Sequence, residues 1–262
     1  MTKINSHIQM PKCVLKNFMD NSERLYYYSF ETQNIIYGRA ASFNTESAYY
    51  SQETENYLRD NVETPFGKIM KFVKDITVED NFVIPDWYID SVRTFIYALL
   101  SRGEVMQKSI KHSSTYFQFY SKQVQHDYAA VMGIEFANRL QILNDWQITF
   151  MVNDSKVPFV LPLQGFYEFS LGENKCNYLN LPISPSHAIT FIPKAYVGEY
   201  LKDGMMKLFH ASNTESINFF NKMAFLAEEK YNQKYIISNK RKIIELLVEQ
   251  NTKRSNMNDD EK

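Results

Sequence analysis

The spacing of apolar residues changes once along this chain, and the change limits the folds that the chain can adopt. From Gln52 to about Leu143, apolar residues recur every three or four positions, as in helices with one buried face. After Asn144 the spacing becomes two, as in a half-buried strand, at Trp146, Ile148, Phe150 and Val152. The sequence therefore predicts an α+β fold, in which a helical layer (about residues 52–143) precedes a region of strands.

Two helices of this layer are clearly marked. One begins near Pro85, and Arg102 falls on its apolar stripe, which consists of Val92, Phe95, Ile96, Leu99, Leu100 and Met106. The other stripe consists of Leu58, Val62, Phe66, Ile69, Val73 and Ile76. Pro65 interrupts it, so either the helix kinks there or Thr64 caps a second helix that opens with Pro65. Both alternatives leave Glu63 beside free backbone groups.

The end of the helical layer is expected to run from Ser114 to about Leu143, with a break near Gly133. Its spacing predicts one inward face, formed by Tyr116, Phe119, Tyr120, Val124, Tyr128 and Val131.

Short antiparallel strands are expected from two regions. Leu25–Phe30 and Ile35–Tyr37 predict an N-terminal hairpin, and the region 145–192 contains further β-prone runs. These runs are residues 158–161, 167–170 and 188–192. C-terminal helices close the fold, one after a capping box at Ser212–Glu215 and one near residues 240–250. We expect one globular domain, residues 1–250, and a disordered tail, residues 251–262.

Composition argues against several classes of protein. With 29 basic and 30 acidic residues the net charge is −1, which argues against a nucleic-acid partner but leaves a local patch at Lys240–Lys242 open. No run of about 20 apolar residues spans a bilayer, and the N-terminus lacks the apolar run of a signal peptide. We therefore expect a soluble cytoplasmic protein without a membrane partner. The partner is unknown, and another protein is one candidate.

No cofactor motif and no metal-binding motif is present. Glycine-rich phosphate loops, nucleophile elbows and paired cysteines at ligand spacing are all missing. The five histidines stand at separations that place no two of them on one helical turn. We therefore expect no cofactor and no metal, although distant segments that converge would escape this reasoning.

Three residues are the candidates for a catalytic or binding site: His7, Glu63 and Arg102. A guanidinium on an apolar stripe must find carboxylates, carbonyls or an anionic ligand, and Glu63 is the nearest logical partner of Arg102. The pair is either a structural tie between two helices or part of an anion-binding pocket. His7 either satisfies backbone groups near the chain end or acts as an acid or base.

Two further patterns have simpler explanations. Tyrosines at 26–28 and at 49–50 could stack nucleic-acid bases, but core or hairpin packing is the better interpretation without interleaved basic residues. His126 and Asp127 are adjacent, and adjacent residues of a helix point about 100° apart, so they make a weak dyad.

Several of these segments resemble the bacterial domain of unknown function 4238 family. Residues 7–18 resemble its opening His-x-x-Pro … Leu-Lys-Asn-Phe signature, and residues 62–69 and 95–102 resemble its helices with a conserved acid and a terminal arginine. Trp146, residues 158–161 and residues 181–185 are similar to its later strands and its Leu-Ser-Pro element. The resemblance covers nearly the whole chain and implies a site, but no reaction.

Two departures from the family pattern affect that site. The family has a Ser-Asp-x-Pro run where this chain has Pro162–Gly165, so an expected acid is missing. The first histidine also stands one residue further from its proline. If the acid belongs to a catalytic site, this chain is altered or inactive; if the run is a turn, Pro162 and Gly165 serve equally well.

Two hypotheses on function follow. The first is an interaction or effector module, in the setting of bacterial conflict or mobile elements, whose buried polar residues are structural. The alternative is an enzyme with a pocket for an anionic substrate, such as a nucleotide or nucleic acid, formed where His7, Glu63 and Arg102 converge. The sequence leaves open whether the chain is an enzyme.

Overall fold

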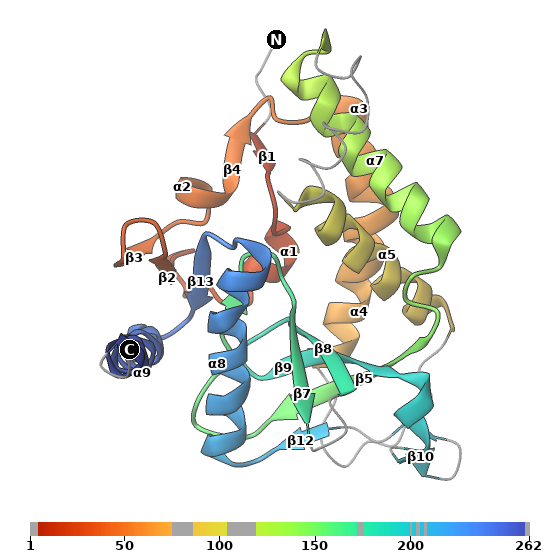
Figure 1. Cartoon of the computed structure of the whole chain (residues 1–262). Helices are drawn as coiled ribbons and strands as arrows, with labels where there is room; N and C mark the ends of the chain where they lie inside the picture. Colours follow the sequence, from red (N-terminus) through yellow and green to blue (C-terminus); the bar gives the residue numbers. More distant parts are fainter. Residues whose placement is uncertain are drawn as a thin grey trace.

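The computed structural model describes residues 5–74, 86–103, 119–171, 176–199, 201–202, 205–206 and 209–259. It has the predicted α+β architecture, with the helices of the helical layer grouped on one side of the molecule and the two larger sheets, together with the two C-terminal helices, on the other (Figure 1). The helical layer is formed by α3 (Gln52–Leu58), a π-helix η1 (Arg59–Glu63), α4 (Thr64–Lys74), α5 (Asp86–Arg102) and α7 (Lys122–Leu140).

A five-stranded sheet packs against this layer. Its strand order is β12 (Phe209–Ala211), β5 (Trp146–Asn153), β9 (His187–Pro193), β8 (Cys176–Pro182) and β7 (Tyr167–Leu171). All neighbours are antiparallel except β12 and β5, which are parallel. The strands expected at 167–170 and 188–192 are therefore confirmed as β7 and β9.

The prediction that β5 is half-buried was wrong, because both of its faces are covered. Ile148 and Phe150 belong to the core under the helical layer, whereas Met151 belongs to a second core under helix α8 (Thr214–Tyr231). Thr149, which lies between Ile148 and Phe150 in sequence, is also buried. The alternating spacing identified the strand correctly, but it did not show that α8 covers the other face.

A four-stranded sheet completes the β region. Its order is β3 (Asn34–Gly38), β2 (Leu25–Ser29), β13 (Tyr235–Ser238) and β6 (Leu161–Pro162). The predicted N-terminal hairpin is confirmed as β2 and β3. The strand expected at 158–161 is shorter and displaced, although Phe159 and Val160 are fully buried beside it. Helix α9 (Arg241–Asp259) packs against β13 and β2.

Short elements connect the two regions. Strand β1 (Asn5–His7) pairs with β4 (Thr45–Ser47), and helices α1 (Lys12–Leu15) and α2 (Ala41–Asn44) lie between them in sequence. Elements η3 (Lys194–Glu199), β10 (Leu201–Lys202) and β11 (Met205–Met206) follow β9.

Around Pro65 the structure contradicts the alternative in which Thr64 caps a second helix. Thr64 has helical dihedral angles (φ −68°, ψ −47°), and its N–H donates to Arg59, five residues earlier. The chain therefore passes from α3 through η1 into α4 without a cap. Proline has no amide hydrogen to give to the preceding turn, and the π-helix, which bonds residues five apart, stands directly before it.

The predicted orientation of α7 was also wrong. The helix continues through Gly133, and its buried residues are small except for one: Ala129, Ala130, Gly133, Ile134 and Ala137. Four of the residues predicted to face inward, Phe119, Tyr120, Val124 and Tyr128, are exposed, and Tyr116 lies outside the described residues. A Cβ on Gly133 would lie 2.6 Å from that of Ser101 on α5, so α7 approaches α5 too closely for large side chains.

The ends of the last two helices differ from the prediction as well. Helix α8 is capped by Asn213, whose Oδ1 accepts from the N–H of Ser216, instead of by Ser212. Helix α9 ends at Asp259 instead of near Gln250, so helix covers residues predicted as a loose tail. Within the described part of the chain, no helix is long and apolar enough to cross a membrane.

Candidate functional site

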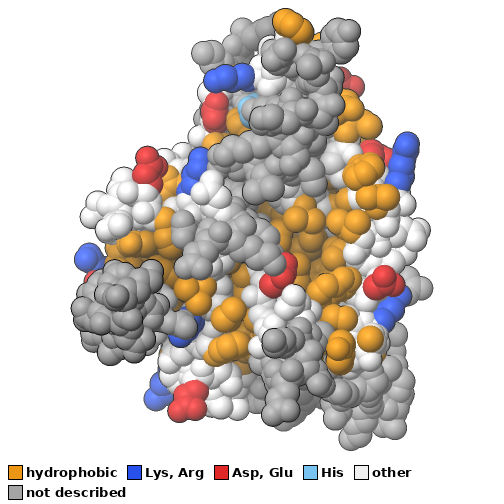
Figure 2. Space-filling model, in the orientation of Figure 1, with side chains coloured by type: hydrophobic (Ala, Val, Ile, Leu, Met, Phe, Trp, Pro, Cys, Tyr) orange, Lys and Arg blue, Asp and Glu red, His pale blue; other side chains and the backbone are white. Residues whose placement is uncertain are grey.

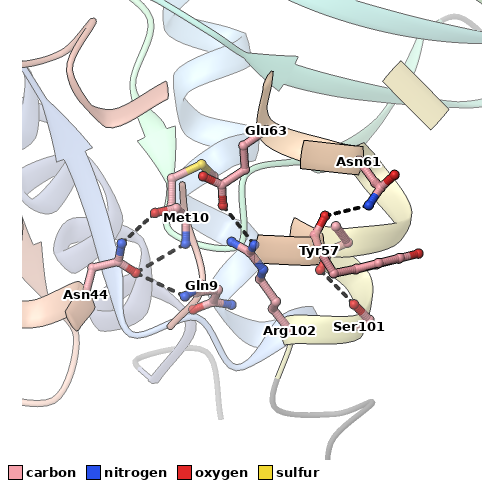
Figure 3. Close-up of polar contacts among 9 residues, drawn as sticks. Gln9, Met10, Asn44, Tyr57, Asn61, Glu63, Ser101 and Arg102 are labelled. Carbon is pink, nitrogen blue, oxygen red and sulfur yellow. Dashed lines mark hydrogen bonds and ion pairs between the residues drawn. The ribbon is translucent and has the colours of Figure 1, made fainter. Parts of the chain in front are cut away.

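The structure brings Glu63 and Arg102 into contact. Glu63 is the last residue of η1 and Arg102 is the last residue of α5, and their side chains point toward one another (Figure 3). Nη2 of Arg102 donates to Oε1 of Glu63 over 2.9 Å. The Arg102 side chain is 1% exposed and that of Glu63 is 27% exposed. The predicted contact between these two residues is therefore confirmed, and the pair joins two helices of the layer.

The guanidinium of Arg102 is buried but only partly paired. Burial acts to lower its pKa, but Glu63, Tyr50 and Glu55 together outweigh this effect and raise the pKa, so the charge is retained. Among the residues that the structure describes, Nε and Nη1 have no hydrogen-bond partner. A guanidinium has N–H donors on all three nitrogens, and Glu63 engages one nitrogen. This arrangement differs from a fully paired structural tie.

Tyr50 belongs to the same cluster, although the sequence gave no reason to single it out as a site residue. It is 1% exposed, and its hydroxyl also lacks a partner within the described ranges. Burial raises the pKa of this hydroxyl, and the charge of Arg102 acts in the opposite direction. Tyr50 was interpreted as a packing residue because no basic residues interleave the tyrosines, and packing explains its ring but not its unpaired oxygen.

His7 lies within electrostatic range of the pair but is not bonded to it. It ends β1, where it is registered opposite Thr45, and it is partly buried. Its pKa is lowered first by burial; Glu63 acts to raise it, whereas Arg102 and Lys12 lower it. No hydrogen bond joins its imidazole to Glu63 or Arg102, and its Nδ1 has no partner in the described chain.

The unpaired buried atoms are concentrated at this cluster. The described chain contains seven buried side-chain nitrogen or oxygen atoms without a partner, and four of them belong to His7, Tyr50 and Arg102. Buried polar atoms are normally hydrogen-bonded, so such a concentration requires a physical reason. We call His7, Tyr50, Glu63 and Arg102 the Arg102 cluster.

The segment around Met10 is fixed beside this cluster by Asn44. The Asn44 amide donates to the carbonyl of Met10 over 2.6 Å, and its Oδ1 accepts from the N–H groups of Gln9 and Met10 (Figure 3). Asn17 performs a similar role, because its Nδ2 donates to the carbonyl of Ile183 over 2.7 Å. These bonds bring together N-terminal and later segments that are far apart in the sequence.

The run Pro162–Gly165 is a buried turn. The N–H of Gly165 donates to the carbonyl of Pro162 over 2.8 Å, and Gly165 has a positive φ of 97°. A Cβ at Gly165 would lie 2.6 Å from both Leu99 and Met10. The turn thus packs under the residues that precede Arg102, which agrees with the structural interpretation of this run.

The charges around the cluster do not favour an anion. Lys12 and Arg102 are positive, and Glu63 together with Glu55, which also acts on Arg102, balances them. Burial raises the pKa of the nearby Cys13 thiol to about 12, so this cysteine is protonated and a poor nucleophile. The arrangement can hold two helices together and can donate hydrogen bonds to a small polar group.

The other groups considered from the sequence do not form a site in the structure. The ring of His126 stacks on Tyr49 with centroids 3.8 Å apart, whereas Asp127 accepts from the N–H of Ser51. Tyr27 and Tyr28 are buried in the cores, as expected for hairpin packing. Within the part of the chain that the structure describes, no group of three or more potential metal ligands is found.

A second candidate site is an exposed apolar row on α7. It consists of Val124 (43% exposed), Tyr128 (48%), Met132 (40%), Phe136 (60%) and Leu140 (57%). These residues recur every four positions and therefore form one ridge along the helix. In Figure 2 hydrophobic side chains reach the surface on the side of the molecule occupied by α7. We call these five residues the α7 ridge.

Comparison with known proteins identifies no relative for this chain. No family model, no curated protein and no solved structure matches it. Its resemblance to the bacterial domain of unknown function 4238 family therefore remains a prediction that rests on the five motifs.

Proposed function

We propose that this chain is an interaction module that binds another protein through the α7 ridge. The observation that carries the proposal is the exposure of five large apolar residues in one row, from Val124 to Leu140. Single exposed apolar residues are common, whereas contiguous apolar patches mark interaction sites. The burial of Arg102 supports the same proposal, since a side chain that is 1% exposed is poorly placed to meet a large substrate.

The proposal is tested by site-specific photocrosslinking in cells that naturally contain the protein. A photoreactive phenylalanine derivative replaces Phe136, which is 60% exposed, in the full chain. We expect a discrete covalent adduct with a protein. The matched control carries the same group at Leu246, which is 41% exposed on α9, and should give no such adduct. Equal labelling at both positions, or none at Phe136, would exclude the α7 ridge as the binding surface.

One observation favours a second function, an enzyme-like or binding pocket at the Arg102 cluster. The unpaired Nε and Nη1 of Arg102 and the unpaired hydroxyl of Tyr50 could donate to a small ligand. Nucleotides and other phosphates are the substrate class of this alternative, because phosphate oxygens accept from guanidinium groups. The balancing charges of Glu55 and Glu63 make it the weaker proposal.

Thermal unfolding decides this second proposal. If the cluster binds inorganic phosphate or a nucleotide, that ligand should raise the midpoint temperature of unfolding of the wild type, because a ligand that binds the folded state stabilises it. Tyr50→Phe keeps the buried ring and removes the hydroxyl, so it should fold and lose that rise. If none of these ligands shifts the wild type, the cluster is a structural tie.

A further inference from the structure

We infer that the partner at the α7 ridge is a second copy of this chain, packed antiparallel about a two-fold axis at Met132. This inference rests on the proposed function and names the occupant of the same surface. Three observations carry it: the division of α7 into two faces, the symmetry of the ridge, and its exposed area.

The inner face of α7 already provides the packing that its own fold needs. It is formed by small residues around Gly133, whose close approach to Ser101 leaves no space between α7 and α5. The α7 ridge is additional to this face. A helix with apolar residues on more than one face is normally covered on each of them. The ridge thus has the composition of a second interface.

The α7 ridge is self-complementary about its central residue. Val124 and Leu140 are equally distant from Met132 along the helix, and so are Tyr128 and Phe136. In an antiparallel pair Tyr128 therefore faces Phe136 of the other copy, and Met132 meets its own copy. Val124 and Leu140 lie eight residues from Met132 and about 80° around the helix from it, so they flank this centre on either side. An interface with two-fold symmetry requires this kind of match, because one surface contacts its own copy. Ridges with four-residue spacing also pack into one another in helix pairs.

The exposed apolar area agrees with the size of a dimer interface. Phe119 (81% exposed), Tyr120 (56%) and Ile142 (45%) extend the surface at the two ends of α7. At about 200 Å² for a large side chain, these residues and the ridge expose on the order of 850 Å². A stable complex buries about 800 Å² on each partner, and monomers seldom expose a larger apolar patch than about 600 Å².

The charges of α7 favour a protein partner over an anionic surface. Helix α7 contains Lys122, Asp127, Glu135 and Arg139, and these charges cancel. Asp127 accepts from the N–H of Ser51, and the Tyr57 hydroxyl donates to Glu135 over 3.3 Å, so both acids are directed toward α3. Because both acids point toward α3, the charges left exposed on α7 are Lys122 and Arg139, and two basic residues are too few to hold nucleic acid or acidic lipid. In an antiparallel pair the two helix dipoles attract each other.

Sedimentation velocity of the purified full chain across a concentration series tests the inference. We expect a reversible dimer with twice the 30.9 kDa mass of the chain. Phe136→Glu should weaken dimerisation at least about 100-fold, since it places a charge opposite Tyr128 of the other copy on both sides of the two-fold axis. The matched control Leu246→Glu should leave the dimer unchanged, and circular dichroism should show that both variants are folded.

A cysteine at Met132 provides an independent geometric test. Residues on a two-fold axis lie next to their own copies, so Met132→Cys should form an intermolecular disulfide on mild oxidation. A cysteine at Leu246 should not. A wild type that stays monomeric at all concentrations would overturn the inference, as would a dimer that survives Phe136→Glu. If the wild type is monomeric but still gives an adduct with a different protein at Phe136, the dimer is excluded and the proposed function stands.

Discussion

The Arg102 cluster and the α7 ridge are opposite exceptions to the usual distribution of side chains, in which charged residues are exposed and large apolar residues are buried. In the cluster, a charged residue that is 3% exposed lies within the helical layer; on the ridge, Phe136 is 60% exposed at its surface. The sequence placed Arg102 on a helical stripe and predicted that two ridge residues, Val124 and Tyr128, face inward. The comparison teaches that periodicity identifies which residues share a face, whereas the neighbouring elements decide whether that face is covered. Four predictions test this comparison, in order of decreasing effect.

Loss of Glu63 should have the largest effect on stability. Glu63→Ala leaves the buried guanidinium of Arg102 without its carboxylate and should lower the free energy of unfolding by about 2–4 kcal/mol. The double variant Glu63→Leu, Arg102→Met removes both charges and should recover most of this loss. Urea unfolding of each variant measures the difference.

The surface pair Arg59–Asp60 provides the matched control, since both side chains are 60% exposed. Asp60→Ala should change stability little, because exposed ion pairs contribute little. Equal losses in Glu63→Ala and Asp60→Ala would contradict the description of Arg102 as a buried charge that depends on Glu63.

A methyl group on the inner face of α7 should have the next largest effect. Gly133→Ala places a Cβ 2.6 Å from that of Ser101 and should cost about 1–3 kcal/mol by overpacking. Gly67→Ala in α4 is the control, because nothing lies within 4 Å of its Cβ. That substitution should stabilise the helix by about 0.5–1 kcal/mol. Thermal or urea unfolding checks both, and a neutral Gly133→Ala would show that α7 is not tightly packed on α5.

His7 should contribute a smaller effect that depends on pH. Burial lowers the pKa of His7 below its ordinary value of 6.5, so the unfolded chain takes up a proton that the folded chain refuses. Stability from this group is complete above pH 6.5 and is lost as the pH falls from there through the lowered pKa. Urea unfolding between pH 8 and pH 5 should show that the free energy of unfolding depends less steeply on pH in His7→Gln than in the wild type. Identical slopes would mean that His7 is solvated.

The α7 ridge should contribute least to the stability of the single chain. Phe136→Ala should change the free energy of unfolding by no more than about 0.5 kcal/mol, measured at a protein concentration low enough to keep the chain monomeric. Phe95→Ala should cost far more, because Phe95 is fully buried and stacks on Phe66 with centroids 3.6 Å apart. A large loss in Phe136→Ala would show that the ridge belongs to the fold.

The candidate site was only partly predictable. Arg102 and Glu63 could be paired from the sequence because a charge on an apolar stripe needs a partner, and Glu63 on the preceding helical segment was the nearest logical one. Tyr50 could not be predicted, because its role depends on the pairing of β4 with β1, which joins residues about 40 positions apart. The unpaired atoms of the cluster are likewise a property of three-dimensional packing.

The sequence by itself determined the fold class, the helical layer, the N-terminal hairpin and the buried stripes within residues 58–73 and 92–99, because these follow from local spacing. Only the tertiary structure decided that β5 is covered on both sides, that a π-helix stands before Pro65 and that α7 turns its small residues inward. The physical reason is that coverage of a face depends on distant segments. Gly133 lets α7 approach α5 closely, so the large residues of the same helix are left on the outside.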